Sequence, residues 1–284
     1  MVRIFGIVNV TRDSFSDGGR CLDPAAAIAH ARRLLDEGAD VIDVGAESTH
    51  PDAEDVPAEE QIARLAPVIE ALKARGVAVS VDAYQPAVIR EALRWGADYV
   101  NDVTALRDPE AVRLVRDAPC GLILMHSRCA SARAERGGGN AANRADAAGI
   151  VYEIIEFFRR RLDQLAAQGI ARPRLILDPG MGYFLGADPR LSFEVLRGLP
   201  RLRSLGCPLL VSTSRKSFIG AMLGGADAPR PVDGRAVGTV VTELWAALQG
   251  VEYVRTHDAR ALRDALTVWS ALRGSDRPEP SRQQ

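Results

Sequence analysis

Short apolar runs recur along the chain, and amphipathic stretches separate them. The runs are rich in β-branched residues and nearly continuous in hydrophobicity, which is typical of parallel strands buried on both faces. Stretches such as 24–38 and 57–76 begin at proline, end at glycine and predict helices between the strands. The strands are predicted at 4–10, 40–45, 77–82, 98–103, 121–126, 174–179, 208–213 and 252–257.

This alternation predicts an α/β fold, a single (β/α)8 TIM barrel, because eight strand–helix units fit the usual length of about 250 residues. A doubly wound open sheet is the alternative. The segment after the first strand, "VTRDSFSDGG" (10–19), lacks the glycine spacing of a dinucleotide loop and so favours the barrel. The barrel domain is expected over residues 1–273, and the polar, proline-containing stretch 274–284 is expected to fray as a tail.

Composition narrows the functional class. The chain is 47% hydrophobic and carries a net charge of −1, which argues against a nucleic-acid partner. Its four cysteines lack C-x-x-C spacing, so reduced thiols are expected rather than a metal site or disulfides. No leader and no apolar run of about 20 residues is visible, which predicts a cytoplasmic protein with no membrane association.

The use of lysine points to one candidate residue. Lys73 and Lys216 are the two lysines among the 36 Lys and Arg residues, and Lys216 follows Arg215 directly. A guanidinium is a planar fork and an ammonium a compact donor, so a site shaped for one does not accept the other. Lys216 is therefore a candidate functional residue, with chance survival of a lysine as the alternative.

Polar residues stand at the end of every predicted strand, where the active site of a barrel is built. They are Asn9, Asp43, Glu47, Asp82, Asn101, Asp102, His126, Asp178, Lys216, Arg255 and His257. Carboxylates, an amide and an ammonium could read the edge of a flat heterocycle, which groups Asp82, Asn101, Asp178 and Lys216. Asn9, Arg255 and His257 suit a phosphate-bearing or metal-bridged anion.

Several connections are longer than a plain turn requires. The first, 9–19, surrounds Phe15 with polar residues and closes on two glycines, as expected for a lid over a substrate. The connection at 47–57 has a similar character. Residues 127–145 and 224–235 lack periodicity and are expected to be functional or mobile loops.

Taken together, these motifs resemble the dihydropteroate synthase family from Gly6 to about Asp258. They stand in order as "GIVNVTRDSFSDGG", "DVGAESTHP", "SVDAY", "NDVT", "LDPGMG", "TSRKSFIG" and "VRTHD". The resemblance implies that 6-hydroxymethyl-7,8-dihydropterin pyrophosphate is joined to p-aminobenzoate, with release of pyrophosphate. It also implies Mg²⁺ as the cofactor, small-molecule substrates as the partners and a homodimer as the assembly.

The resemblance also implies roles for individual residues. The pterin ring would lie against Asp82, Asn101, Asp178 and Lys216, and Asn9 would carry the Mg²⁺ on the pyrophosphate. Thr49, Arg255 and His257, with Asn9, would bind the pyrophosphate itself. The p-aminobenzoate pocket would be bordered by Phe15, Thr49, Pro51, Tyr183, Phe184 and Ser217. Catalysis would rest on Asp17, Lys216, Arg255 and His257.

The residue types fit an SN1-like reaction. Pyrophosphate leaves a CH₂ beside an electron-rich ring, so the site must neutralise the leaving group and exclude water. Two rival interpretations remain. A methyltetrahydrofolate–corrinoid methyltransferase would share the pterin edge but would not need Arg255 and His257. A non-catalytic pterin- or folate-binding protein would not need them either.

The chain departs from the family pattern mainly on the p-aminobenzoate side. His50 replaces an arginine and Ala46 replaces a glycine. Tyr183, Phe184 and Leu185 stand where the family has a segment that ends in lysine, and they add aromatic and aliphatic bulk. These segments resemble the mobile, sulfonamide-insensitive forms of the family. Our hypothesis is that the pocket accepts p-aminobenzoate and excludes sulfonamides; ordinary drift in a housekeeping enzyme is the alternative.

Overall fold

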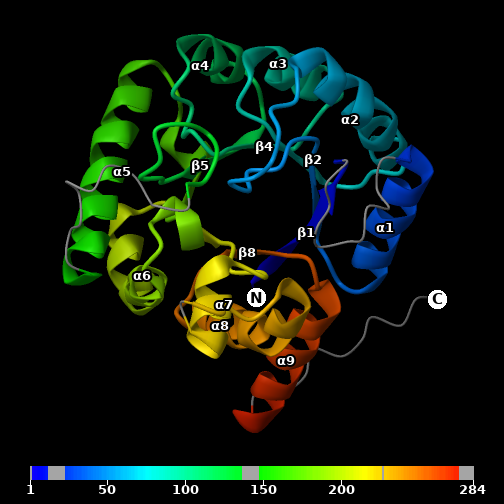
Figure 1. The fold of residues 1–284 in the computed structure, drawn as a ribbon. Coiled ribbons are helices and arrows are strands. Elements are labelled where there is room, and N and C mark those ends of the chain that lie inside the picture. Colours follow the sequence, from blue (N-terminus) through cyan, green and yellow to red (C-terminus); the bar gives the residue numbers. More distant parts are fainter. Residues whose placement is uncertain (1, 12–22, 136–146, 226, 275–284) are drawn as a thin grey trace.

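The computed structural model describes residues 2–11, 23–135, 147–225 and 227–274. Eight parallel strands form a barrel inside a ring of helices, so the fold is a TIM barrel and the open-sheet alternative is excluded (Figure 1). The strands are β1 (Arg3–Asn9), β2 (Val41–Gly45), β3 (Val79–Asp82), β4 (Tyr99–Asp102), β5 (Gly121–Met125), β6 (Leu175–Asp178), β7 (Leu210–Val211) and β8 (Tyr253–Thr256). All eight lie within or next to the predicted ranges.

The helices begin where the sequence supplies start signals. Asp23, Asp108 and Asp188 each accept a hydrogen bond from a backbone N–H of the first turn, and proline follows each of them at the first helical position. The helices are α1 (Pro24–Asp36), α2 (Ala58–Lys73), α3 (Pro86–Arg94), α4 (Pro109–Arg116), α5 (Ile150–Ala167), α6 (Pro189–Leu202), α7 (Ser217–Gly224), α8 (Ala236–Leu248) and α9 (Ala259–Leu272).

The barrel closes through a narrow seam between β6 and β7. Seven neighbouring strand pairs form ladders, whereas β6 and β7 meet through one bridge between Leu177 and Leu209. β7 is shorter than predicted because Pro208 has no N–H to donate, and the N–H of Leu209 donates to the Glu252 carboxylate at 2.8 Å. The hydroxyl-bearing residues that follow, Ser212 to Ser214, are buried without continuing the strand.

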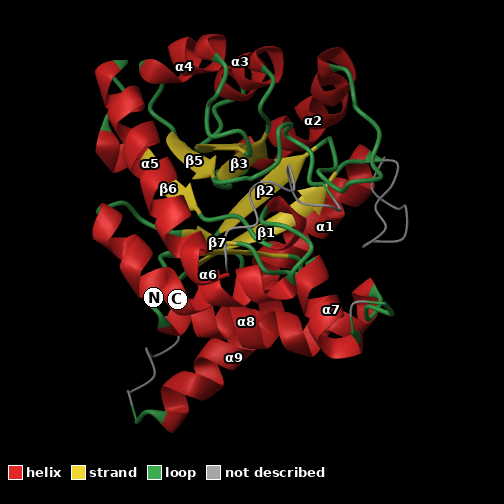
Figure 2. Cartoon of the chain, turned by 60° about the vertical axis from the view of Figure 1, so that its left-hand side comes forward, coloured by secondary structure: helices red, strands yellow, loops and turns green. Residues whose placement is uncertain are grey.

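The inside of the barrel changes character from one end to the other. At the amino ends of the strands, Phe5 packs edge-on against Tyr99 and Tyr253, with ring centroids 5.2 and 5.5 Å apart. Because strand side chains alternate between two faces, the next inward residues lie two positions further along. On β2 and β8 these are Asp43 and Arg255. The aromatic layer thus closes the floor beneath a polar mouth. Figure 2 shows the strands inside the barrel and the helices around them.

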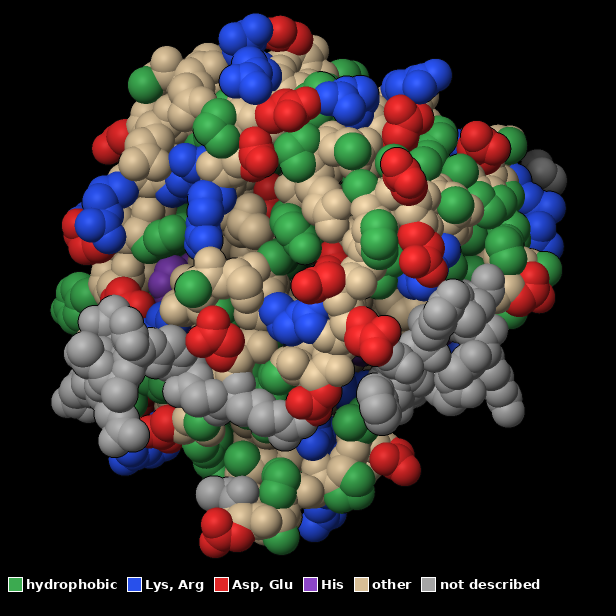
Figure 3. All heavy atoms as spheres, turned by 45° about the horizontal axis from the view of Figure 1, so that its top comes forward, with side chains coloured by type: hydrophobic (Ala, Val, Ile, Leu, Met, Phe, Trp, Pro, Cys, Tyr) green, Lys and Arg blue, Asp and Glu red, His purple; other side chains and the backbone are tan. Residues whose placement is uncertain are grey.

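Acidic and basic side chains are mixed on the face of the molecule that Figure 3 shows. This mixture is in keeping with the near-zero net charge. Within the described ranges, no helix is long and apolar enough to cross a membrane. Cys120, Cys129 and Cys207 are buried and form no disulfide in this part of the chain.

Candidate active site

Arg255 stands at the centre of the polar mouth. Its Nε donates to Oδ2 of Asp43 at 2.5 Å, and Nη2 donates to Oδ2 of Asp82 at 2.6 Å. The Asp43 side chain is fully buried, and the other two are 16% exposed. The two carboxylates raise the pKa of Arg255 against the effect of burial. One guanidinium therefore links β2, β3 and β8 across the barrel.

The predicted pterin residues lie side by side at the carboxyl ends of the strands. Asp82 pairs in register with Asn101 of β4, and Asp178 ends β6. Burial raises the pKa of Asp82 to about 7, with Arg255 opposing the rise and Asp43 adding to it. Burial also raises the pKa of Asp178, although the Gly180 N–H donates to its carboxylate at 2.8 Å. Burial thus raises the pKa of both acidic groups at these strand ends.

Lys216 reaches the same mouth from the loop after β7. Burial lowers its pKa to about 8, while the nearby Asp178 and Asp82 favour the charged form. The ammonium lies 5.1 Å from the centre of the Phe184 ring. Arg215, just before it, has a φ of 59°, a left-handed conformation that is strained for a residue with a side chain. A strained turn therefore aims the lysine at the carboxylates.

His257 occupies the rim above β8. Its Nδ1 lies 2.9 Å from the Ser214 hydroxyl, which also accepts the His257 backbone N–H at 3.2 Å. Burial and the cations Arg215, Arg255 and Lys216 lower the pKa of His257 well below 6.5. The imidazole is therefore neutral at neutral pH and can bind an anion only as an N–H donor.

The predicted p-aminobenzoate residues surround the start of α7. Ser217 is its first residue, and Gly182 packs so close to the Ser217 hydroxyl that a Cβ there would lie 2.9 Å from it. Gly182 also has a φ of 65°, so both the close contact and the backbone conformation exclude a larger residue. Phe184 is buried, and Tyr183 packs against the same apolar cluster. These aromatic groups form one wall beside Lys216.

Thr49 and Pro51 lie on the other side, in the loop after β2. Both are half-buried, and the Thr49 carbonyl accepts the Ala134 N–H at 3.0 Å. Asn9 ends β1, in register with Gly45 of β2. The lid expected at 9–19 is described only as far as Thr11. Phe15 and Asp17 lie outside the described residues. The same holds for 136–145 of the loop expected at 127–145, and for the tail beyond Gly274.

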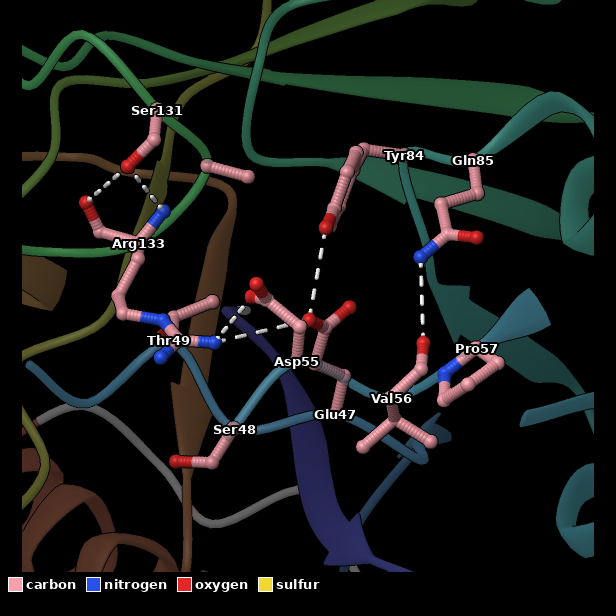
Figure 4. A pocket seen from close by; sticks show the side chains of 11 residues that line it. Glu47, Ser48, Thr49, Asp55, Val56, Pro57, Tyr84, Gln85, Ser131 and Arg133 are labelled. Carbon is pink, nitrogen blue, oxygen red and sulfur yellow. Dashed lines mark hydrogen bonds and ion pairs between the residues drawn. The ribbon is translucent and has the colours of Figure 1, made fainter. Parts of the chain in front are cut away.

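A hollow of about 680 Å³ opens between the loops after β2, β3 and β5 (Figure 4). Its polar centre is Glu47, which accepts hydrogen bonds from Gln61 at 2.9 Å and Tyr84 at 3.4 Å. Arg133 pairs with Asp55 at 2.5 Å and approaches Glu47 at 3.9 Å. Thr49 lines this hollow as well.

Two strand-end residues expected in the shared pocket point elsewhere. The Asp102 carboxylate accepts from the backbone N–H groups of Thr104 and Leu106, and burial raises its pKa to about 6. His126 turns toward α5, where its Nε2 lies 3.6 Å from Glu153. Both expectations of a place in the pocket were wrong, because a strand end gives position but not the face on which a side chain lies.

Asp43 is the residue to which sequence reasoning gave no role. It was one of the polar strand-end residues, yet the structure makes it the main partner of Arg255. The alternation of side chains along a strand could have predicted this position, because Asp43 lies on the same inward face of β2 as Val41. Its Oδ1 and the Ser80 Oγ are buried without a hydrogen-bond partner among the described residues.

Within the described ranges, no group of three or more His, Cys, Asp or Glu side chains could hold an ion. Mg²⁺ commonly keeps several waters and is held by one or two protein oxygens plus substrate phosphates. Asn9 supplies one amide oxygen of this kind at the end of β1.

Comparisons with known proteins agree on one family. The family model for pterin binding enzymes matches residues 5–257. The type-2 dihydropteroate synthase of Escherichia coli is 46% identical over 275 residues, which cover 96% of this chain and 97% of that protein.

Solved structures give the same result. The Xanthomonas albilineans dihydropteroate synthase with 4-aminobenzoic acid has a TM-score of 0.83 and 41% identity, covering 96% of this chain and 93% of that one. The same enzyme in complex with 7,8-dihydropteroate has a TM-score of 0.80 and 40% identity, covering 96% and 94%.

Proposed function

Because this chain belongs to the pterin binding enzymes and, among them, to the dihydropteroate synthase family of transferases, we propose its reaction in detail. It condenses 6-hydroxymethyl-7,8-dihydropterin pyrophosphate with p-aminobenzoate to give dihydropteroate and pyrophosphate. The observation that carries this proposal is the ring of Asp82, Asn101, Asp178 and Lys216 beside Arg255 and His257. A heterocycle edge and an anion can be bound there at once.

The pterin would be read by complementary donors and acceptors. Carboxylates accept from the amino and ring N–H groups, the Asn101 amide does both, and Lys216 donates to a ring acceptor. Because Asp82 is already engaged by Arg255, its position is fixed before substrate arrives. A prearranged site spends less binding energy on ordering its own side chains.

Departure of pyrophosphate is the step the protein must assist. Arg255 keeps further N–H donors beyond the two bonded to Asp43 and Asp82, and the neutral His257 offers one more. Mg²⁺, held by Asn9 and the phosphate oxygens, would supply further neutralisation of the leaving charge. The arrangement supports an SN1-like path, in which bond breaking leads and the weakly basic amine needs no strong base.

Insensitivity to sulfonamides is proposed for the same pocket. The buried Phe184 belongs to the apolar cluster that contains Met125 and Cys129, and its ring centre lies 5.1 Å from the Lys216 ammonium. Such a wall limits the room behind p-aminobenzoate, and the bulkier sulfonyl group would collide with it. The resemblance of these segments to the mobile forms supports the same interpretation.

The experiment is pyrophosphate release by the purified protein with both substrates and Mg²⁺, with and without sulfamethoxazole. We expect turnover that persists at drug concentrations that stop a sulfonamide-sensitive homologue. Full inhibition at those concentrations would leave the synthase and disprove the insensitivity. Absence of turnover in a folded protein would disprove the synthase. Mg²⁺ with pyrophosphate should also raise the melting temperature, which a corrinoid-dependent or purely pterin-binding protein would not show.

A homodimer is the assembly we propose. α8 exposes a stripe at helical spacing, with Val237, Val241, Trp245 and Leu248 exposed by 78, 60, 44 and 37%. Exposed apolar patches rimmed by polar residues mark interaction sites. Light scattering should show a dimer for the wild type and a monomer for Val241→Glu, because the stripe would then bury an unpaired charge. Arg113→Glu on α4 serves as the matched control, and a monomeric wild type would contradict the proposal.

A further inference from the structure

The buried face of α8 is unusually polar. Its inward residues include Thr239, Thr242 and Glu243, where an outer barrel helix normally presents apolar side chains. Thr239 accepts the Arg215 backbone N–H at 3.0 Å, and the Thr242 hydroxyl donates to that of Thr213 at 2.9 Å. This face therefore holds the loop that carries Lys216.

Glu243 has no such assigned task. The residue is fully buried, and neither carboxyl oxygen has a partner with normal hydrogen-bond geometry among the described residues. The Thr256 hydroxyl lies near enough to interact with this carboxyl, and Asp258 and Arg215 act on it electrostatically. Buried carboxyl groups without a partner are rare and call for an explanation.

A chain of hydroxyl groups leads from Glu243 to the active site. Thr256 lies next to Ser214, with their side-chain oxygens 3.4 Å apart. Ser214 in turn lies 2.9 Å from Nδ1 of His257. Thr256 and Ser214 are both buried, so water does not compete for these contacts.

The number of donors and acceptors on each hydroxyl group fixes the direction of this hydrogen-bond chain. Each hydroxyl has one hydrogen to donate and two lone pairs to accept with. Ser214 accepts the His257 backbone N–H, and Thr256 accepts the Asp258 backbone N–H. If a carboxylic acid donates to Thr256, then Thr256 must donate to Ser214 and Ser214 to Nδ1. With an acceptor in its place the order can reverse, and Nδ1 then carries the proton.

We propose that Glu243 is a positioning residue whose carboxylic acid directs this chain, so that His257 keeps its proton on Nε2 and presents it to the pyrophosphate. Glu243 touches no substrate and acts through Thr256 and Ser214. This inference rests on the proposed function only in the identity of the anion. The direction of the chain is a property of the protein without substrate.

The protonation state of Glu243 agrees with this role. Burial raises the pKa of Glu243 to about 8, so the carboxyl group is a donor at neutral pH. The depressed pKa of His257 makes its tautomer decisive, because a neutral imidazole has a single N–H.

The first test is the tautomer of His257 in the substrate-free protein, read from the ¹⁵N shifts of its ring by long-range ¹H–¹⁵N spectroscopy at pH 7. His257→Gln identifies the signal among the four histidines. We expect Nε2–H in the wild type and in Glu243→Gln, whose amide can still donate to Thr256. Glu243→Leu should shift the population toward Nδ1–H. Thr242 lies on the same face of α8 but is not part of the hydrogen-bond chain, so Thr242→Val should leave the tautomer unchanged.

The second test is binding of Mg²⁺ with pyrophosphate by calorimetry. Glu243→Leu should weaken it by about tenfold or more, the size of one hydrogen bond to a charged group. KM for p-aminobenzoate should stay the same. The melting temperature of Glu243→Leu should be equal or higher, because leucine removes a fully buried polar group whose geometry toward Thr256 is poor. A merely structural role would instead lower the melting temperature.

Two results would overturn the proposal. One is an Nδ1–H tautomer in the wild type, and the other is an unchanged tautomer and affinity in Glu243→Leu. If the tautomer behaves as expected but the wild type does not bind pyrophosphate, the hydrogen-bond chain stands and the synthase assignment fails.

Discussion

Replacing Arg255 with Met should destabilise the protein by about 3 to 5 kcal/mol at pH 8, because it strands two buried carboxylates. Asp43 and Asp82 both depend on this guanidinium, at 2.5 and 2.6 Å. Urea unfolding of the variant and the wild type measures the difference. Arg255→Lys should recover only part of the loss, since an ammonium cannot form both bonds in the same fork geometry.

The loss should depend on pH. The pKa of Asp82 is raised from 3.8 to about 7 in the folded protein, so the folded state binds more protons than the unfolded chain between those values. The contribution of Asp82 to stability therefore falls as the pH rises through that window. Without Arg255 the pKa rises further, and the variant should lose less stability at pH 5 than at pH 8.

A triple variant provides the control. Combining Arg255→Met with Asp43→Asn and Asp82→Asn removes all three charges, so most of the stability should return while pyrophosphate release stays abolished. A loss below about 1 kcal/mol for Arg255→Met at pH 8, as small as that of a surface ion pair, would show that the three residues do not form a buried unit.

Lys216→Arg should lower kcat/KM by at least about a hundredfold, or about 2.7 kcal/mol of transition-state stabilisation. The Lys216 ammonium lies over the Phe184 ring, and the lysine side chain packs beside Gly182. A guanidinium is wider and planar and cannot occupy the same space. Lys73→Arg is the matched control, because Lys73 forms a partly exposed pair with Asp98 at 2.7 Å and should tolerate the change.

The pH profile separates charge from shape. Since burial lowers the pKa of Lys216 to about 8, kcat/KM of the wild type should decline above that pH as the ammonium loses its proton. The residual activity of Lys216→Arg should show no such decline, because the guanidinium stays charged. Equal activity of Lys216→Arg and wild type would contradict a site shaped for ammonium.

Much of the fold followed from the sequence because parallel barrel strands are buried on both faces and read as continuous apolar runs. β7 was predicted too long, since Pro208 and the hydroxyl groups that bond to α8 are invisible to a hydropathy pattern. The strand ends predicted where the site lies, but a residue belongs to the site only if its side chain lies on the inward face of the strand. Asn101 and Asp102 are neighbours, yet Asp102 turns back to its own loop.

The charged centre was harder to predict. Asp43 and Arg255 are 212 positions apart, and no local pattern connects them. The polar face of α8 was missed for a similar reason, because Thr and Glu in a helix suggest exposure. Only the packing of α8 against the ends of β7 and β8 shows that these groups are buried and act on the loop after β7.

Because β6 and β7 meet through the single bridge between Leu177 and Leu209, we expect this side of the barrel to open at the lowest free energy. Asp178 stands on one side of this seam and Lys216 on the other. A heterocycle bound by both residues would connect the two sides of the seam. Amide hydrogens along the seam would then exchange more slowly when the ligand is bound, even where they do not contact it.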